Sequence, residues 1–192
     1  KSVIFNQGAD VDAVYAVKSG LIETNGLNPA GREVTLSIRG PGESFGYSEP
    51  ILGRPRTRQA TALLDAEVWC MDADAFIGML SERPDVILAM LGSALDRVTQ
   101  SSEMRADLRG TSARSRVGYV LSLLSDNTED LAAAAQPLLQ ITHEEISRIC
   151  DISRQTVTKI LGMMRRERVL ELGLRSIRIL DRSRLAQLDY DE

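Results

Sequence analysis

Residues 141–170 read ITHEEISRICDISRQTVTKILGMMRRERVL, and this stretch decides the fold of the C-terminal half of the chain. Thr142 is suited to be the N-cap of a helix, and Glu145 can complete a capping box by accepting a hydrogen bond from the Thr142 backbone amide. A turn at residues 150–152 comes next, and Ser153 can cap a second helix. The spacing therefore predicts a helix, a tight turn and a second helix.

The apolar residues of both predicted helices recur at helical spacing and should face a common core. They are Ile146 and Ile149 in the first helix, and Val157, Ile160 and Leu161 in the second. The second helix then presents four polar side chains outward, namely Arg154, Gln155, Thr158 and Lys159. In a helix-turn-helix unit such side chains meet base edges in the major groove. The alternative is a helical hairpin whose charged face is merely solvated.

Two short apolar runs, 169–172 and 177–180, flank a turn at 173–176 and predict a β-hairpin, which makes the unit a winged helix. Five arginines crowd the end of the second helix and the wing: Arg165, Arg166, Arg168, Arg175 and Arg178. Residues 141–184 hold ten Lys or Arg against six Asp or Glu, a balance of +4, whereas the whole chain carries −4. Positive charge is therefore concentrated where DNA phosphates would lie.

The first 80 residues contain short apolar runs separated by glycines, a pattern that is typical of a β-barrel or β-roll. A composition of 43% hydrophobic and 26% charged residues over 192 positions suits one or two ordinary folded cores. The sequence contains no run that approaches the roughly 20 apolar residues of a membrane span. We therefore expect a cytoplasmic protein without membrane contact.

Three segments of the first half, VYAVKSGLIE (14–23), AGREVTLSIRGPGESFG (30–46) and RPRTRQATA (54–62), resemble the cyclic-nucleotide-binding roll of one family in order and spacing. That family is the cyclic-AMP receptor protein and FNR (CRP/FNR) family of bacterial transcription regulators, and the helix-turn-helix is similar to theirs. The resemblance implies an α+β fold with a sensory β-roll in residues 1–83, a dimerisation helix in 84–110 and a winged-helix DNA-binding domain in 111–192. It also implies a homodimer that binds a palindromic operator in double-stranded DNA and works with RNA polymerase.

Residues 84–109 should form one long helix between the two halves. Leu91, Leu95, Val98, Ser102 and Arg105 recur at steps of four and three, the spacing of a two-stranded coiled-coil seam. A helix packed on its own domain is the alternative. A symmetric dimer would place two recognition helices roughly 34 Å apart, so that they read half-sites one helical turn apart.

The predicted DNA contacts fall into two classes. Arg154, Gln155 and Lys159 are expected to reach base edges, with Thr158 beside them on the same helical face. Phosphate contacts are expected from Thr142, His143, Ser153, Thr156 and the wing arginines, including Arg175.

The resemblance also indicates an effector site in the roll. In cyclic-AMP-binding members a glycine and a glutamate meet the ribose, an Arg-Ser or Arg-Thr pair binds the phosphate, and two hydroxyls of the dimer helix meet the adenine. The residues implied here are Gly46, Tyr47, Arg56, Thr57, Arg58, Ser101 and Ser102. Ser101 and Ser102 would couple effector binding to the relative orientation of the two DNA-binding domains in the dimer.

The Arg56-Thr57 pair matches the phosphate position, and the planar fork of an arginine suits phosphate. Tyr47 stands where the family has its glutamate, so the ribose contact is missing, and Arg58 replaces a small residue. The effector is therefore cyclic AMP, another small anion, or none at all. Alternatively, Arg56 and Arg58 are solvated loop residues.

Cys70 falls near the position of the roll cysteine that holds an iron–sulfur cluster in the FNR branch. The other three ligands would lie outside this sequence, and we expect Cys70 to be a buried strand residue, so no metal site is assigned.

Two other functions have some support in the sequence. Residues 42–46 fit GxSxG, and Ser44, Asp126 and His143 follow the chain order of an α/β-hydrolase triad. That motif needs a helix after the serine, whereas residues 47–50 are expected to form a loop, so we expect no enzyme. The other alternative is a ligand-sensing dimer whose helix-turn-helix contacts protein.

Overall fold

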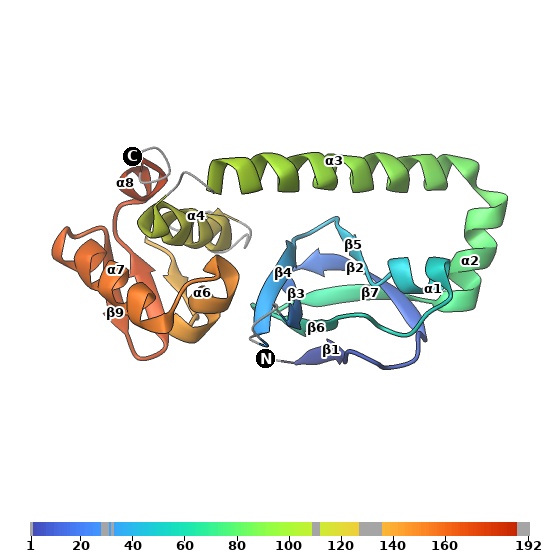
Figure 1. Ribbon diagram of the computed structural model, residues 1–192, viewed down its shortest axis with the longest axis horizontal. Helices are drawn as coiled ribbons and strands as arrows, with labels where there is room; N and C mark the ends of the chain where they lie inside the picture. The colour runs from blue at the N-terminus through green and yellow to red at the C-terminus, as the bar shows by residue number, and fades with distance from the viewer. Residues whose placement is uncertain (1, 28–30, 32, 109–111, 127–135, 188–192) are drawn as a thin grey trace.

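The computed structural model of the chain describes residues 2–27, 31, 33–108, 112–126 and 136–187. These residues form an N-terminal β-roll, a long helix and a C-terminal domain, in that order along the chain (Figure 1). The α+β architecture with a roll, a long helix and a winged helix-turn-helix confirms the fold expected from the sequence.

The roll consists of two antiparallel sheets. The four-stranded sheet has the order β1 (Val3–Phe5), β6 (Gln59–Ala62), β3 (Ile22–Leu27) and β4 (Glu33–Arg39). The three-stranded sheet has the order β5 (Ser44–Phe45), β2 (Ala13–Ser19) and β7 (Glu67–Asp72). Val17, Ile22, Phe45 and Ala60 form a buried cluster in the roll, against which Tyr15 packs with its ring stacked on that of Phe45, the ring centroids 5.2 Å apart.

The turn between β2 and β3 depends on Gly20. Its φ of +77° lies in the left-handed region, and a Cβ there would stand 2.0 Å from the Asp65 carbonyl oxygen. Only glycine meets both requirements, so the connection between the two sheets relies on this residue.

Residues 48–52 correct one expectation, because they form the short helix α1 (Ser48–Leu52) where a loop was predicted. Pro50 lies in the first turn, where its missing N–H is tolerated. Gly53 ends the helix with φ +61°, and the Arg54 amide donates to the Glu49 carbonyl at 3.2 Å. A proline near the start and a glycine just past the end is a helix pattern that could have been recognised in the sequence.

Helix α2 (Ala73–Glu82) leads into the long helix α3 (Pro84–Leu108). Asp72 caps α2 by accepting a hydrogen bond from the Ala75 amide at 2.9 Å. Figure 1 shows α3 running above the roll toward the C-terminal domain as a single rod. The side chains of Ser102 and Arg105, two members of the predicted seam, lie outside the described residues.

The C-terminal domain contains the two helices and the hairpin predicted from the sequence. Its elements are α4 (Ala113–Asp126), β8 (Leu138–Leu139), α6 (His143–Cys150), α7 (Arg154–Arg166), β9 (Leu170–Gly173), β10 (Ser176–Ile179) and α8 (Arg182–Gln187). The capping box at Thr142 is formed as expected, with the Thr142 amide donating to Glu145 Oε2 at 2.7 Å. Strand β8 adds a third strand to the wing, which sequence patterning missed.

The roll and the C-terminal domain contact each other, with α6 beside β4 (Figure 1). Leu21 and Leu63 of the roll belong to the same apolar cluster as the buried residues of the C-terminal domain. Beside this cluster, Arg148 of α6 donates to Glu23 Oε1 at 2.9 Å and to Glu33 Oε2 at 3.2 Å. Only 1% of the Glu23 side chain is exposed, so its charge depends on a cation from the other domain.

We expect Arg148→Met to lower the free energy of unfolding by about 3 kcal/mol, because removing one partner of a buried pair leaves the other charge uncompensated. Glu33→Gln is the matched control, since the Glu33 side chain is 44% exposed and exposed pairs contribute at most about 1 kcal/mol. Equilibrium urea unfolding measures both variants. Equal, small losses in the two would contradict a dependence of Glu23 on Arg148.

Candidate DNA-reading surface and effector site

Helix α7 presents one polar face to solvent and buries the opposite one. Val157, Ile160, Leu161 and Met164 are buried against the rest of the domain. The side chains of Arg154, Gln155, Thr158 and Lys159 are exposed, as the sequence predicted. At the turn before α7, Asp151 adopts φ +46° and the Ser147 hydroxyl donates to the Ile152 carbonyl at 2.6 Å, which fixes the direction in which α7 starts.

The predicted phosphate contacts at the helix starts have structural roles of their own. The Ser153 hydroxyl accepts a hydrogen bond from the Thr156 amide at 3.1 Å and lies 2.8 Å from the Thr156 hydroxyl. The Thr142 hydroxyl donates to Glu145 Oε2 at 2.8 Å. These side chains therefore hold the first turns of α6 and α7 in place, next to the polar face of α7.

His143 links the two helices of the motif. Its Nδ1 lies 2.9 Å from Thr158 Oγ1, and the Thr158 hydroxyl also donates to the Arg154 carbonyl at 3.0 Å. Partial burial lowers the pKa of His143 below its ordinary value, and the charge of Arg154 lowers it further. The ring is therefore neutral at physiological pH in the free protein.

The arginines predicted around the wing all reach solvent. They are Arg165, Arg166, Arg168, Arg175 and Arg178. Arg168 and Arg175 lie at turns with φ +59° and +56°, on either side of the hairpin strand β9. At the hairpin tip the Leu174 side chain is 95% exposed. The cationic surface thus runs from the end of α7 onto the wing.

The structure places the predicted effector arginine in the interior of the roll. The Arg56 side chain has no solvent exposure, so it is not a solvated loop residue. Its Nη1 donates to the Gly46 carbonyl at 2.6 Å, and its Nη2 donates to the Ala13 carbonyl. The guanidinium lies 4.1 Å from the centre of the Phe5 ring. Arg56 is thus part of the roll interior.

The other predicted effector residues are scattered around Arg56. Gly46 adopts φ +70°, and a Cβ there would stand 2.9 Å from Arg56 Nη1, so the glycine permits the close approach of the arginine. Thr57 and Arg58 are exposed, while Tyr47 precedes α1. The side chains of Ser101 and Ser102 lie outside the described residues, so they stay a prediction.

Sequence reasoning missed Glu49, which contacts both members of the Arg56-Thr57 pair. Glu49 Oε1 accepts a hydrogen bond from the Thr57 hydroxyl at 2.6 Å, and Glu49 Oε2 lies 3.9 Å from Arg56 Nη1. The glutamate sits three residues after Gly46, on α1, instead of directly after the glycine. Recognising α1 in the sequence would have brought Glu49 to attention.

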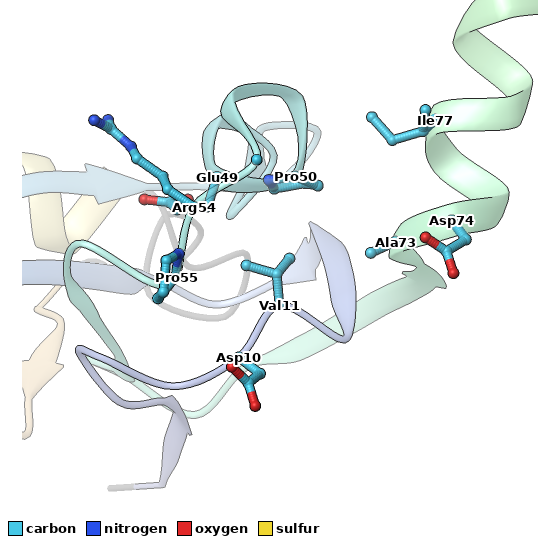
Figure 2. Close-up of a pocket in the computed structure, with 10 residues that line it drawn as sticks. Asp10, Val11, Glu49, Pro50, Arg54, Pro55, Ala73, Asp74 and Ile77 are labelled. Atoms are coloured by element: carbon cyan, nitrogen blue, oxygen red, sulfur yellow. The ribbon is translucent and has the colours of Figure 1, made fainter.

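A pocket of about 290 Å³ lies beside this cluster, between α1, the loop before β2 and the start of α2 (Figure 2). Its charged lining residues are Asp10, Glu49, Asp74 and Arg54, so acidic groups outnumber the basic one. An anion in this pocket would therefore meet net repulsion.

A second pocket, of about 270 Å³, lies between the three-stranded sheet and helices α2 and α3. Most of its lining is apolar, including Trp69, Met71, Val86 and Met90. Cys70 also lines it and is exposed, which corrects the expectation of a buried residue. The reason is that β7 is an edge strand whose side chains mostly face solvent. Cys150 is the buried cysteine, and desolvation raises the pKa of its thiol to about 12.

The hydrolase triad is not assembled. Ser44 belongs to β5, where it pairs with Ala16 of β2, whereas His143 begins α6 in the C-terminal domain. Asp126 ends α4, and its side chain lies outside the described residues. Within the part of the chain that the structure describes, three or more potential metal-ligating side chains do not gather at one point.

Comparison with known proteins agrees with this geometry. The cyclic nucleotide-binding domain family matches residues 1–83, and the Crp-like helix-turn-helix domain family matches residues 115–188. A CRP-like cAMP-activated global transcriptional regulator of Mycobacterium tuberculosis is 30% identical over 186 residues, which is 96% of this chain and 83% of that protein. This chain belongs to the CRP/FNR family.

Other relatives extend the likeness. The cyclic AMP receptor protein of Thermus thermophilus is 29% identical over 188 residues, covering 97% of this chain and 84% of that protein. A CRP-family transcriptional regulator from the same species has a solved structure with a TM-score of 0.78 at 24% identity, covering 100% of this chain and 94% of that one. A c-di-GMP responsive global regulator of Xanthomonas campestris has a TM-score of 0.74 at 19% identity over 94% and 90% of the two chains. These two structures show the shared fold.

Membership of the CRP/FNR family confirms the resemblance seen in the sequence and makes the chain a DNA-binding transcription regulator, not an enzyme. Among the described residues, every helix is too short or too polar to cross a bilayer.

The single histidine of the chain allows the electrostatics of the reading surface to be tested. We expect the ring signals of His143 to titrate in NMR with a pKa below 6.5, and Arg154→Ala to raise that pKa because it removes a repelling charge. Folded protein then binds this proton less readily than unfolded protein. The contribution of His143 to stability is therefore full above pH 6.5 and declines as the pH falls below that value.

Arg178→Ala, which removes a charge on β10, is the control and should leave the titration of His143 unchanged. A wild-type midpoint at or above 6.5 would contradict the environment described for the ring.

Proposed function

We propose that the chain is a homodimeric, sequence-specific regulator that presents the polar face of α7 to the major grooves of a palindromic operator. The observation that carries the proposal is the division of α7 into a buried apolar face and an exposed polar one. Two capped helix starts and the turn at Asp151 hold this face in position. Such a rigid polar helix face is what readout of base edges requires.

Within this proposal, Arg154, Gln155 and Lys159 contact base edges, and Thr158 lies between them. Thr142, His143, Ser153, Thr156 and Arg175 contact phosphates and so fix the register of the protein on the duplex. Support for this assignment comes from the exposure of the α7 side chains and from the arginines that continue the surface onto the wing.

The proposed dimer forms along α3. Four apolar side chains follow each other at steps of three, four and three, and all are more than half exposed: Leu88 68%, Leu91 52%, Leu95 57% and Val98 64%. Val86 and Met90, on another side of the helix, face the roll. A row of exposed leucines at coiled-coil spacing favours a second copy of the helix as its cover, and disfavours a helix packed on its own domain.

The remaining assignments are proposals of the same kind. We propose a sensory domain in residues 1–83, a dimerisation helix in 84–110 and a DNA-binding domain in 111–192, with RNA polymerase as a partner and the cytoplasm as location. Contacts of Arg148 with Glu23 and Glu33 join the roll to the DNA-reading domain. In this proposal a change of state in the roll acts through these contacts and the shared apolar cluster, and shifts the population of DNA-competent arrangements.

The competing function is a dimer whose helix-turn-helix contacts another protein. Salt separates the two possibilities, because counterion release makes DNA binding fall steeply as the salt concentration rises, whereas an apolar protein interface barely responds. The exposed arginines at the end of α7 and on the wing favour DNA.

We expect Arg154→Ala to weaken binding to an operator selected from random duplexes by about 1–3 kcal/mol and to relax the preference at one base pair. The comparison variant is Arg175→Ala, which should weaken binding alike on all sequences and reduce the salt slope by roughly one. Fluorescence anisotropy over a salt series measures both. If Arg154→Ala also weakened binding uniformly, Arg154 would be a phosphate contact.

We expect Leu95→Glu to convert the dimer to a monomer, because two opposed carboxylates would have to be buried in the seam. Ala89→Glu adds the same charge to an exposed position of α3 beside the seam and should leave the dimer intact. Analytical ultracentrifugation gives the oligomeric state of each variant. A Leu95→Glu protein that remains dimeric would show that the two copies meet elsewhere.

A further inference from the structure

We propose that Glu49 is a built-in occupant of the roll's phosphate-binding position, so that no anionic effector binds at Arg56 and Thr57. The inference concerns the effector of the regulator proposed above, but the contacts that support it lie within the roll alone. Cyclic nucleotides and other phosphate-bearing ligands are the class of effector that it excludes.

Both terminal nitrogens of Arg56 are already occupied by the protein. Its two terminal nitrogens donate to the backbone carbonyls of Gly46 and Ala13, and its plane lies against the Phe5 ring. The remaining donor, Nε, is buried without a hydrogen-bond partner among the described residues, and the whole side chain has no solvent exposure. A ligand arriving from solvent therefore finds no exposed donor on Arg56.

Glu49 supplies the negative charge that a buried arginine requires. Only 6% of its side chain is exposed, and its Oε2 lies 3.9 Å from Arg56 Nη1. Asp12 also faces Arg56, at 3.7 Å from Nη2, but its side chain is 80% exposed and thus largely screened by water. Glu49 is therefore the effective counter-charge of Arg56.

Glu49 also accepts a hydrogen bond from the hydroxyl of Thr57, the second member of the pair. Its Oε1 accepts the Thr57 hydroxyl at 2.6 Å and lies 3.4 Å from the Thr57 amide, while Ser48 donates to Oε2 at 3.0 Å. Burial acts to raise the pKa of Glu49, but hydrogen bonds from Thr57 and Ser48 outweigh it and hold the pKa below 4.5. The carboxylate is charged at neutral pH and serves both residues that the family uses for phosphate.

The surroundings agree with a closed site. Arg56 lines neither of the two pockets described above, and the charged residues that line the pocket beside Glu49 are mostly acidic. Figure 2 shows Glu49 and Arg54 on the α1 side of that pocket, across from Asp74 and Ile77 of α2. The roll is thus held in one state by its own carboxylate, and the affinity for DNA should not change with cyclic nucleotide.

The test compares the thermal stability of wild type, Glu49→Ala and Asp12→Asn in cyclic AMP, in inorganic phosphate and in chloride at equal ionic strength. We expect neither anion to raise the wild-type Tm above its value in chloride. Glu49→Ala should melt lower in chloride and should regain about 5–10 °C, saturably, at about 100 times the Kd of either anion. Asp12→Asn, which removes the exposed carboxylate, should behave like wild type.

Two results would overturn the proposal: a saturable rise of the wild-type Tm with cyclic AMP or phosphate, or a folded Glu49→Ala protein that responds to anions no more than Asp12→Asn. If Glu49→Ala does not fold, Glu49→Gln keeps the volume and removes only the charge. It should melt below wild type, because Arg56 then lacks its buried counter-charge, and a Glu49→Gln protein as stable as wild type would contradict the proposal. Failure of the wild-type protein to bind DNA would refute the proposed function, but it would not alter the interpretation of these melting results.

Discussion

The fold and the function both depend on the burial of one side of α7. Because Val157, Ile160, Leu161 and Met164 must be withdrawn from water, the helix has one rotation about its axis in the domain. That rotation turns Arg154, Gln155 and Lys159 outward together. The polar face is therefore a consequence of core packing, and the caps at Thr142 and Ser153 only sharpen where each helix begins.

A second constraint governs the roll, where a permanently charged arginine is enclosed. Removing the charge of Arg56 from water costs free energy, and hydrogen bonds and a nearby negative charge must offset that cost. Two backbone carbonyls and Glu49 meet this requirement inside the chain. A family position associated with ligand binding has thus become part of the architecture, and the same arginine holds β2, the end of β5 and α1 together.

Much of the fold could be predicted because its determinants are local. The capping box, the wing hairpin and the glycine-punctuated strands each lie within a few residues of sequence, and each is found in the structure. Features that rest on contacts between distant residues were missed. Nothing local indicates that Arg148 meets Glu23, that Glu49 meets Arg56, or that Cys70 lies on an uncovered edge strand. Among the missed features, only α1 had a local sequence signal, namely Pro50 near its start and Gly53 just after its end.

The contact between Leu21, Leu63 and the apolar cluster of the C-terminal domain has a consequence for cooperativity. Separating the two halves would expose part of their common core to water and would leave Glu23 without its cationic partner Arg148. The two domains should therefore unfold in one transition instead of two. A fragment cut at the start of α3 would expose an apolar surface and would tend to aggregate. The two halves are therefore not expected to fold independently, because each buries part of its core against the other.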